Sequence, residues 1–74
     1  MLIVYPNPAS ETISLKCTED LTGFRYLIKD ISGRTVCSGY YNSKINIKAE
    51  AGIYFIELRK DNSYYQCKFT TIKK

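Results

Sequence analysis

The stretch FRYLIKDISGRTVCS, residues 24–38, indicates the fold class of this chain. Over residues 24–31 apolar side chains recur at every second position, which is the period of a β-strand with one buried face. The polar turn that follows contains Gly33, which can adopt the positive φ of a tight hairpin. Residues 35–38 return as a second extended segment, so the stretch predicts an antiparallel β-hairpin. Its buried face would carry Phe24, Tyr26 and Ile28.

The same alternation, interrupted by polar turns, continues on both sides of this hairpin. Strands are predicted over residues 2–5, 12–17, 24–31, 35–38, 45–48, 53–59 and 65–69. No window of helical period and useful length remains. The pattern predicts an all-β fold, a small Ig-like antiparallel β-sandwich of about seven short strands, in a single domain spanning residues 1–74. "Ig-like" describes the architecture only, because the chain has no tryptophan for the Cys–Trp–Cys arrangement of antibody domains.

Several positions in this pattern have predicted structural roles. The sixth predicted strand has apolar residues on both faces and is therefore expected to be central. Tyr54 on this strand would bury its ring and bond its hydroxyl at the rim of the sandwich. Gly52 would permit a close backbone approach just before the strand. Pro6 and Pro8, on either side of Asn7, would end the first strand and fix the entry to the domain.

The charge of the chain is moderately positive. Its 74 residues include 11 Lys and Arg against 7 Asp and Glu, a formal charge of +4. This charge allows weak attraction to nucleic acid or to an anionic surface. The basic residues are scattered along the sequence, which favours a solubilising surface over a dedicated binding site. The one basic cluster is at the C-terminus and consists of Lys68, Lys73 and Lys74.

Residues that usually carry catalysis or bind metals are scarce. The chain has no histidine, so the usual acid–base group near neutral pH is missing, and most carboxylates fall in predicted turns. Three dispersed cysteines without histidine do not make a zinc site. The four glycines are too far apart for a phosphate-binding loop. We therefore expect no cofactor and no enzymatic activity.

The three cysteines have different surroundings in the predicted strands. Cys17 and Cys67 lie in phase with apolar neighbours and are expected to be small core residues. Cys37 has no evident partner. A disulfide between two of the three is compatible with their number, but the spacing does not identify a pair.

Seven tyrosines are the most distinctive feature of the composition. Tyr26, Tyr54 and Tyr65 fall in phase with the predicted core, where tyrosine suits a half-buried pleated surface. The candidates for an exposed binding surface are Tyr40, Tyr41 and Tyr64. Such a surface would fit an adhesion or carbohydrate-accessory module. A nucleic-acid-binding barrel is disfavoured, because no aromatic residue is interleaved with a dense basic stripe.

Three parts of the sequence together resemble one known family. Residues 4–10, VYPNPAS, followed by Ile13, resemble the opening of type IX secretion system C-terminal sorting domains, type A. The hairpin over residues 26–36 is similar to their central motif, through Asp30, Gly33 and Arg34. The ending of the family is matched by residues 45–47, 51–56 and 68–74.

The resemblance implies a function that composition and spacing do not supply. Sorting domains of this family end secreted proteins of Bacteroidetes. The parent would reach the periplasm by its own signal peptide, on a cargo domain N-terminal to this chain. The type IX translocon would then carry it to the outer-membrane surface or outside the cell, where a sortase removes the domain and attaches a surface anchor.

The resemblance also points to a set of recognised residues, and the fold adds one partner. The candidates for translocon recognition are Gly52, Tyr54, Lys68, Lys73 and Lys74. An edge strand of a small sandwich can pair with a copy of itself. A homodimer through edge strands is therefore a further expectation.

Overall fold

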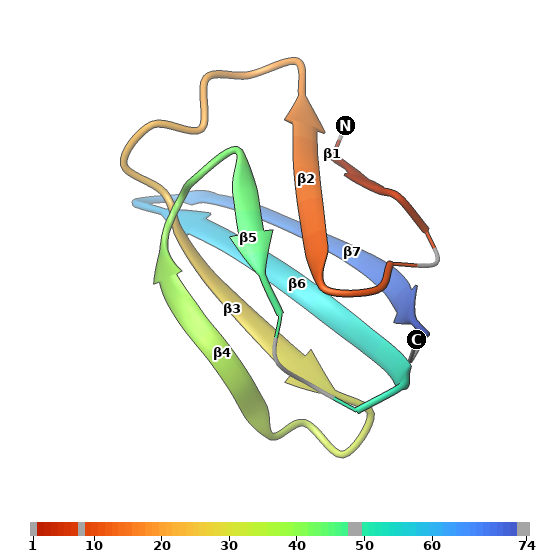
Figure 1. Ribbon diagram of the computed structural model, residues 1–74. Helices are drawn as coiled ribbons and strands as arrows, with labels where there is room; N and C mark the ends of the chain where they lie inside the picture. Colours follow the sequence, from red (N-terminus) through yellow and green to blue (C-terminus); the bar gives the residue numbers. More distant parts are fainter. Residues whose placement is uncertain (1, 8, 48–49, 73–74) are drawn as a thin grey trace.

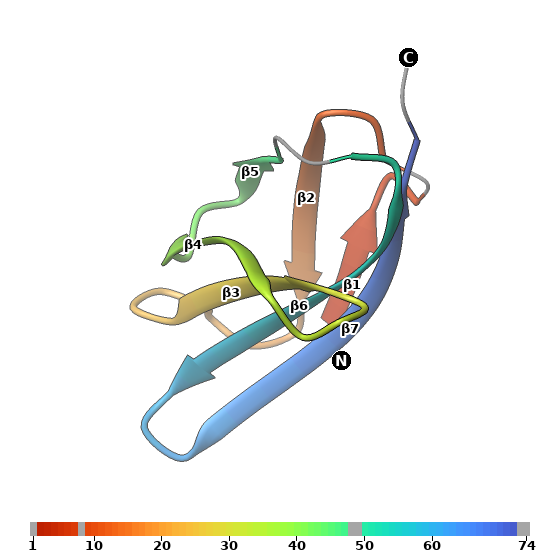
Figure 2. The same cartoon turned by 90° about the horizontal axis from the view of Figure 1, so that it is seen from below.

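The computed structural model describes residues 2–7, 9–47 and 50–72, which form seven β-strands in two antiparallel sheets (Figure 1). The strands are β1 (Leu2–Tyr5), β2 (Thr12–Cys17), β3 (Arg25–Asp30), β4 (Thr35–Tyr40), β5 (Lys44–Asn46), β6 (Gly52–Lys60) and β7 (Ser63–Thr71). One sheet has the order β1-β2-β5 and the other β4-β3-β6-β7. Figure 2 shows the two sheets as layers facing each other. The predicted small antiparallel β-sandwich is confirmed.

The core lies between the two layers and is made by alternate residues of each strand. Its largest fully buried side chains are Phe69, Ile13, Ile28, Ile56 and Leu58. Burying a side chain of this kind stabilises the fold by about 1.5–3 kcal/mol. As predicted, β6 is central, because it pairs with β3 on one side and with β7 on the other.

The cysteines and two of the predicted core tyrosines lie at the margin of this core. Tyr26 and Tyr65 are half-buried and pack against it, as do Cys17, Cys37 and Cys67. All three cysteines are free thiols. The expected core positions of Cys17 and Cys67 are thus confirmed in part, since both thiols contact the core but are not fully buried.

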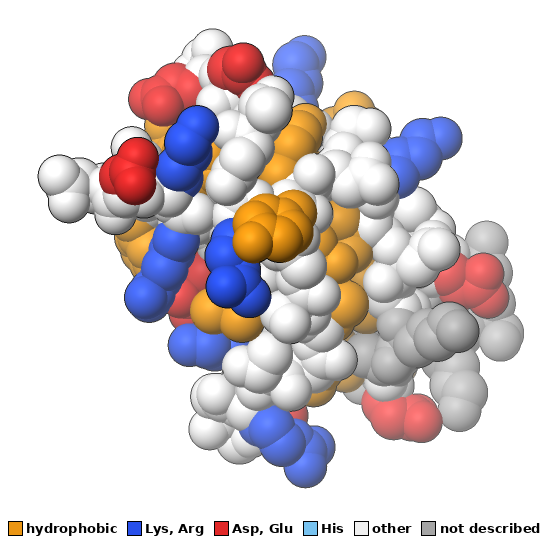
Figure 3. Space-filling view, turned by 90° about the vertical axis from the view of Figure 1, so that its left-hand side faces the viewer, with side chains coloured by type: hydrophobic (Ala, Val, Ile, Leu, Met, Phe, Trp, Pro, Cys, Tyr) orange, Lys and Arg blue, Asp and Glu red, His pale blue; other side chains and the backbone are white. Residues whose placement is uncertain are grey.

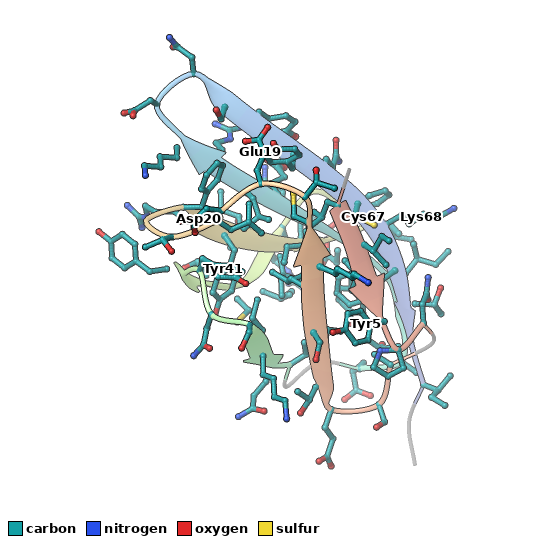
Figure 4. All side chains as sticks on the ribbon, turned by 90° about the horizontal axis from the view of Figure 1, so that it is seen from above. Tyr5, Glu19, Asp20, Tyr41, Cys67 and Lys68 are labelled. Atoms are coloured by element: carbon teal, nitrogen blue, oxygen red, sulfur yellow. The ribbon has the colours of Figure 1, made fainter. Side chains whose placement is uncertain are left out.

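Strand β4 is longer than predicted, and the reason is a cross-strand contact. Gly39 and Tyr40, expected in a loop, continue the strand and pair with Tyr26 and Arg25 of β3. A Cβ atom at Gly39 would lie only 3.0 Å from a ring carbon of Tyr26. The missing side chain therefore makes room for the Tyr26 ring on the inner face of the sheet. The expectation that Tyr41 is exposed is wrong, because it is half-buried against the core where β4 ends (Figure 4).

Replacing Gly39 by alanine is expected to destabilise the fold by about 1 kcal/mol, because the new methyl group must displace the Tyr26 ring. Urea unfolding followed by circular dichroism measures the change. The matched control is Ser38→Ala, on the neighbouring exposed position of the same strand. An unchanged midpoint for Gly39→Ala would mean that the Tyr26 ring does not occupy this position in solution.

Each sheet ends in two edge strands, β1 and β5 in one and β4 and β7 in the other. Over residues 70–72 the outer edge of β7 is covered by the segment after β1, through a parallel bridge between Ala9 and Thr71.

Among the described residues, no helix is long and apolar enough to cross a membrane.

Candidate functional site

The turn between β3 and β4 is organised by one carboxylate. Oδ1 of Asp30 accepts hydrogen bonds from the backbone N–H groups of Ser32 and Arg34, both at 3.0 Å, and from the Ser32 hydroxyl at 2.6 Å. Gly33 adopts a φ of +89°, which a side chain would disfavour. The Arg34 guanidinium lies 3.4 Å from the other carboxylate oxygen of Asp30. These bonds hold the turn in one shape at the surface.

The hydrogen bond from the Ser32 hydroxyl, helped by the backbone N–H groups and the Arg34 charge, lowers the pKa of Asp30 below its ordinary value of 3.8. The charged carboxylate therefore stabilises the fold above about pH 4, and the contribution disappears as the pH falls through the lowered pKa. Asp30→Asn is expected to lower the melting temperature at pH 7. The gap between variant and parent should shrink steadily below pH 4. A gap that is the same at pH 3 and pH 7 would contradict this role of the charge.

The segment after β1 is bound to the last residues of β7. Asn7 Oδ1 accepts a hydrogen bond from the Thr70 N–H at 3.0 Å. The Ala9 N–H donates to the Thr70 carbonyl at 2.8 Å, and the Ile72 N–H donates to the Ala9 carbonyl at 2.7 Å. Ala9 is fully buried. The segment after β1 is therefore joined to the end of β7 by one side-chain and two backbone hydrogen bonds, and Figure 2 shows these two segments side by side.

A second group of hydrogen bonds joins the start of β6, and Glu50 just before it, to the end of β7. The Glu50 carbonyl accepts from the Tyr54 hydroxyl at 2.6 Å and from Thr71 Oγ1 at 3.0 Å. Thr71 Oγ1 also accepts from the Gly52 N–H at 3.1 Å. The Tyr54 ring is only 6% exposed and its hydroxyl is bonded at the rim, as the sequence predicts. Thr71 is buried, although nothing in the sequence pattern singles it out.

The predicted close approach at Gly52 is wrong. Within the described part of the chain, a Cβ atom there would meet a Tyr54 ring carbon at 3.8 Å and nothing nearer, which is an ordinary contact. The backbone at Gly52 is not in the left-handed region that favours glycine. Its role in the structure is to present its N–H to Thr71 Oγ1. The sequence pattern did not suggest this partner because the two residues are 19 positions apart.

These groups meet at one end of the sandwich because of the strand register. Asp30 pairs with Tyr54 between β3 and β6, and Gly52 pairs with Thr71 between β6 and β7. We define the motif end by the residues that meet there: Asn7, Ala9, the turn 30–34, residues 50–54 and residues 70–72. Three of its large apolar side chains are exposed: Ile31, Ile53 and Ile72.

The other predicted site residues are placed less centrally. Pro6 follows a cis peptide bond and is exposed. Lys68 is exposed on β7, and its side chain points away from the sheet (Figure 4). Pro8, Lys73 and Lys74 lie outside the described residues. Lys68 pairs with Phe55 of β6 and precedes Thr70 on β7, so it lies just outside the motif end.

One buried carboxylate was missed by the sequence interpretation, which placed most carboxylates in turns. Glu57 lies in the middle of β6 and is buried. Lys29 Nζ lies 3.0 Å and an Arg59 guanidinium nitrogen 3.1 Å from its oxygens. The hydrogen bond from Lys29, together with Arg59, lowers the pKa of Glu57 below its ordinary value. Among the described residues, no group of three or more metal-binding side chains comes together.

Comparison with known protein families gives a match. The family described as "Secretion system C-terminal sorting domain" matches residues 3–73, nearly the whole chain. A comparison with curated proteins finds no match. The family match spans every segment of the motif end and confirms the resemblance on which the sequence analysis relied. The chain belongs to the family of C-terminal sorting domains of the type IX secretion system.

Proposed function

We propose that this sorting domain is recognised in its folded form, through the motif end, by the outer-membrane translocon of the type IX system. The observation that carries the proposal is that sequence segments more than 60 residues apart, joined by the hydrogen bond between Asn7 and Thr70, build one surface. A linear signal would not need this convergence. A signal that depends on shape does, because each segment is held in place by the others.

The residues that match the family are largely engaged inside the domain. The Tyr54 ring is buried, and the oxygens of Asp30 and Asn7 bind backbone N–H groups. In the proposal these residues, with Gly52, act by shaping the surface. Direct contact would fall to exposed neighbours, namely Ile31, Arg34, Ile53, Lys68 and Ile72. Lys73 and Lys74 remain predicted contacts at the terminus.

The rest of the route follows from the same role. The parent would cross the periplasm with this domain at its C-terminal end, and the translocon would deliver it to the outer-membrane surface or the medium. There a sortase would cut upstream of residues 4–10 and replace the domain by an anchor. The domain would serve as ligand and substrate in these steps and would itself catalyse none of them.

The decisive experiment is an export assay. A signal peptide and a fluorescent reporter are placed before residues 1–74 in a Bacteroidetes strain, with a translocon-deficient strain as the reference. Reporter should reach the surface or the medium only in the competent strain. The double variant Ile31→Ser/Ile53→Ser should reduce export at least tenfold without unfolding the domain, since both side chains are exposed.

The matched control for this variant is Ile3→Ser. Ile3 is an exposed isoleucine on β1, close to the opposite end of the sandwich. Export of the control should equal that of the parent. Equal loss in the control, or a folded parent fusion that stays in the periplasm of the competent strain, would contradict recognition through the motif end.

Pairing of two copies through an edge strand stays a prediction. The β7 edge between Ser63 and Lys68, which pairs with no further strand among the described residues, is the place where a second copy could add a strand. Sedimentation equilibrium from 10 to 500 μM is the measurement. A single monomeric species over this range would contradict the dimer.

A further inference from the structure

Four side chains form a row across the outer face of the four-stranded sheet, away from the core. Arg25 in β3 pairs with Tyr40 in β4 and with Arg59 in β6, and Arg59 pairs with Tyr64 in β7. Residues that are directly opposite in a sheet point to the same face. The order across the face is therefore Tyr40, Arg25, Arg59, Tyr64, and we call these four residues the Tyr–Arg row.

The rings and the guanidinium groups of the row are in contact. The Arg25 guanidinium carbon lies 5.4 Å from the Tyr40 ring centre, and that of Arg59 lies 5.2 Å from the Tyr64 ring centre. These are cation–π distances, which hold each arginine above a ring. Tyr40 is nonetheless 70% exposed and Tyr64 49% exposed. The row thus offers ordered cations and exposed rings together.

The centre of the row carries positive charge that the carboxylates of the described residues neutralise only in part. Arg25 and Arg59 are direct cross-strand neighbours, an arrangement in which like charges destabilise a sheet. Glu57 binds Arg59, but it is shared with Lys29. Lys60 adds a further cation, and its Nζ donates to the Thr22 carbonyl. An anion between the two guanidinium groups would relieve their repulsion.

The row borders a hollow at the surface. An open hollow of about 500 Å³ is lined by Gly23, Arg25, Leu27, Tyr40, Arg59, Lys60 and Asp61. Lys and Arg side chains gather around exposed hydrophobic groups on the face that Figure 3 draws. Leu27 is the one aliphatic side chain among these lining residues, and three cations stand beside the single carboxylate of Asp61.

We propose that the Tyr–Arg row binds an acidic oligosaccharide. A carboxylate, sulfate or phosphate substituent would sit between the Arg25 and Arg59 guanidinium groups, whose planar forks match such oxyanions. The apolar faces of the adjoining sugar rings would lie against Tyr40 and Tyr64. The two arginines are a single pair of direct cross-strand neighbours, whereas a nucleic-acid strand needs cations spaced along a track of phosphates.

This site would be separate from the export signal. Arg25 begins β3, Arg59 and Tyr40 lie near the last residues of β6 and β4, and Tyr64 lies near the start of β7. The register therefore puts the row at the opposite end of the four-stranded sheet from Asp30, Gly52 and Thr71. A glycan could bind while the motif end is occupied, so the proposal neither requires nor tests the sorting role.

The test is an amide NMR titration of the chain with a sulfated disaccharide, in 50 mM salt. Shifts should centre on the Tyr–Arg row, with a dissociation constant in the millimolar range. Arg25→Ala/Arg59→Ala should weaken binding at least tenfold, and Tyr40→Ala/Tyr64→Ala several-fold. The matched control is Lys16→Ala/Lys44→Ala, which removes the same charge from two exposed positions of the other sheet and should bind like the parent.

Three control ligands, namely the unsulfated disaccharide, inorganic sulfate and a short oligothymidylate, together with one further variant identify the occupant. The unsulfated disaccharide should not bind, and inorganic sulfate alone should bind at least fivefold more weakly than the sulfated sugar. Glu57→Gln should tighten binding, because it frees Arg59 from its carboxylate. The proposal is overturned if the lysine control loses as much affinity as the arginine variant. It is also overturned if sulfate alone or a short oligothymidylate binds as tightly as the sulfated sugar.

Discussion

Replacing Phe69 by alanine will lower the free energy of unfolding of the domain by about 3–5 kcal/mol. Phe69 is 1% exposed, and its ring stacks on that of Tyr54 with centres 6.0 Å apart. Truncating a buried phenylalanine costs about 3–5 kcal/mol, through lost burial and the cavity left behind. A chain of this length has a free energy of unfolding of only about 4–11 kcal/mol. One substitution therefore removes a large fraction of the stability.

Urea unfolding followed by circular dichroism measures this loss as a shift of the midpoint. The control is Gln66→Ala in the same strand, where the side chain is exposed and little change is expected. In the export assay, Phe69→Ala should also reduce secretion if the folded domain is the signal. A variant that unfolds at the midpoint of the parent would show that Phe69 does not join the two sheets. An unfolded variant that is still exported would refute recognition of the folded form.

The architecture was predictable from sequence wherever a local pattern carries the information. The hairpin over residues 24–38 combines alternating apolar and polar residues with a turn. Asp30 and Gly33 are both residue types that stabilise such a turn. The central place of β6 followed from apolar residues on both of its faces, because only a strand covered on both sides tolerates them. These features depend on neighbours within a few positions along the chain.

The missed features depend on register between strands that are distant in sequence. Gly39 resembled a loop residue until Tyr26 was found opposite it. Thr71 resembled a polar strand end, yet its hydroxyl bonds the Glu50 carbonyl. Most carboxylates were expected in turns, but Glu57 is buried in β6, where Lys29 and Arg59 compensate its burial. A hydroxyl or a charge is satisfied by its partner, and the sequence alone does not name the partner.

The distribution of charge shows the same limit. The basic residues are scattered along the sequence, which favoured a merely solubilising surface. Folding brings Arg25 and Arg59 together although 34 positions separate them in the sequence, because β3 and β6 pair antiparallel. Of the three tyrosines expected at the surface, folding aligns Tyr40 and Tyr64 with these arginines and buries part of Tyr41. A cluster of this kind is visible only once the register is known.

Two truncations of the C-terminus will distinguish recognition of the folded shape from recognition of the terminal lysines. Removing residues 70–74 deletes every partner of Asn7 and Ala9 on β7 and the hydroxyl of Thr71. Each net hydrogen bond contributes about 0.5–1.5 kcal/mol. With at least four lost, the free energy of unfolding should fall by about 3 kcal/mol or more. Urea unfolding measures the change. An unaltered midpoint would mean that the segment after β1 is not bound to the end of β7 in solution.

Removing only Lys73 and Lys74 keeps Thr70, Thr71 and Ile72, and with them every one of these hydrogen bonds. The midpoint of unfolding should then match that of the parent. Export gives the decisive comparison, because the two truncations differ in stability but both lack the terminal lysines. Loss of export in the stable truncation would mean that the translocon contacts the lysines themselves. Full export without Lys73 and Lys74, together with loss of export when residues 70–74 are removed, would mean that the translocon recognises the shape of the motif end.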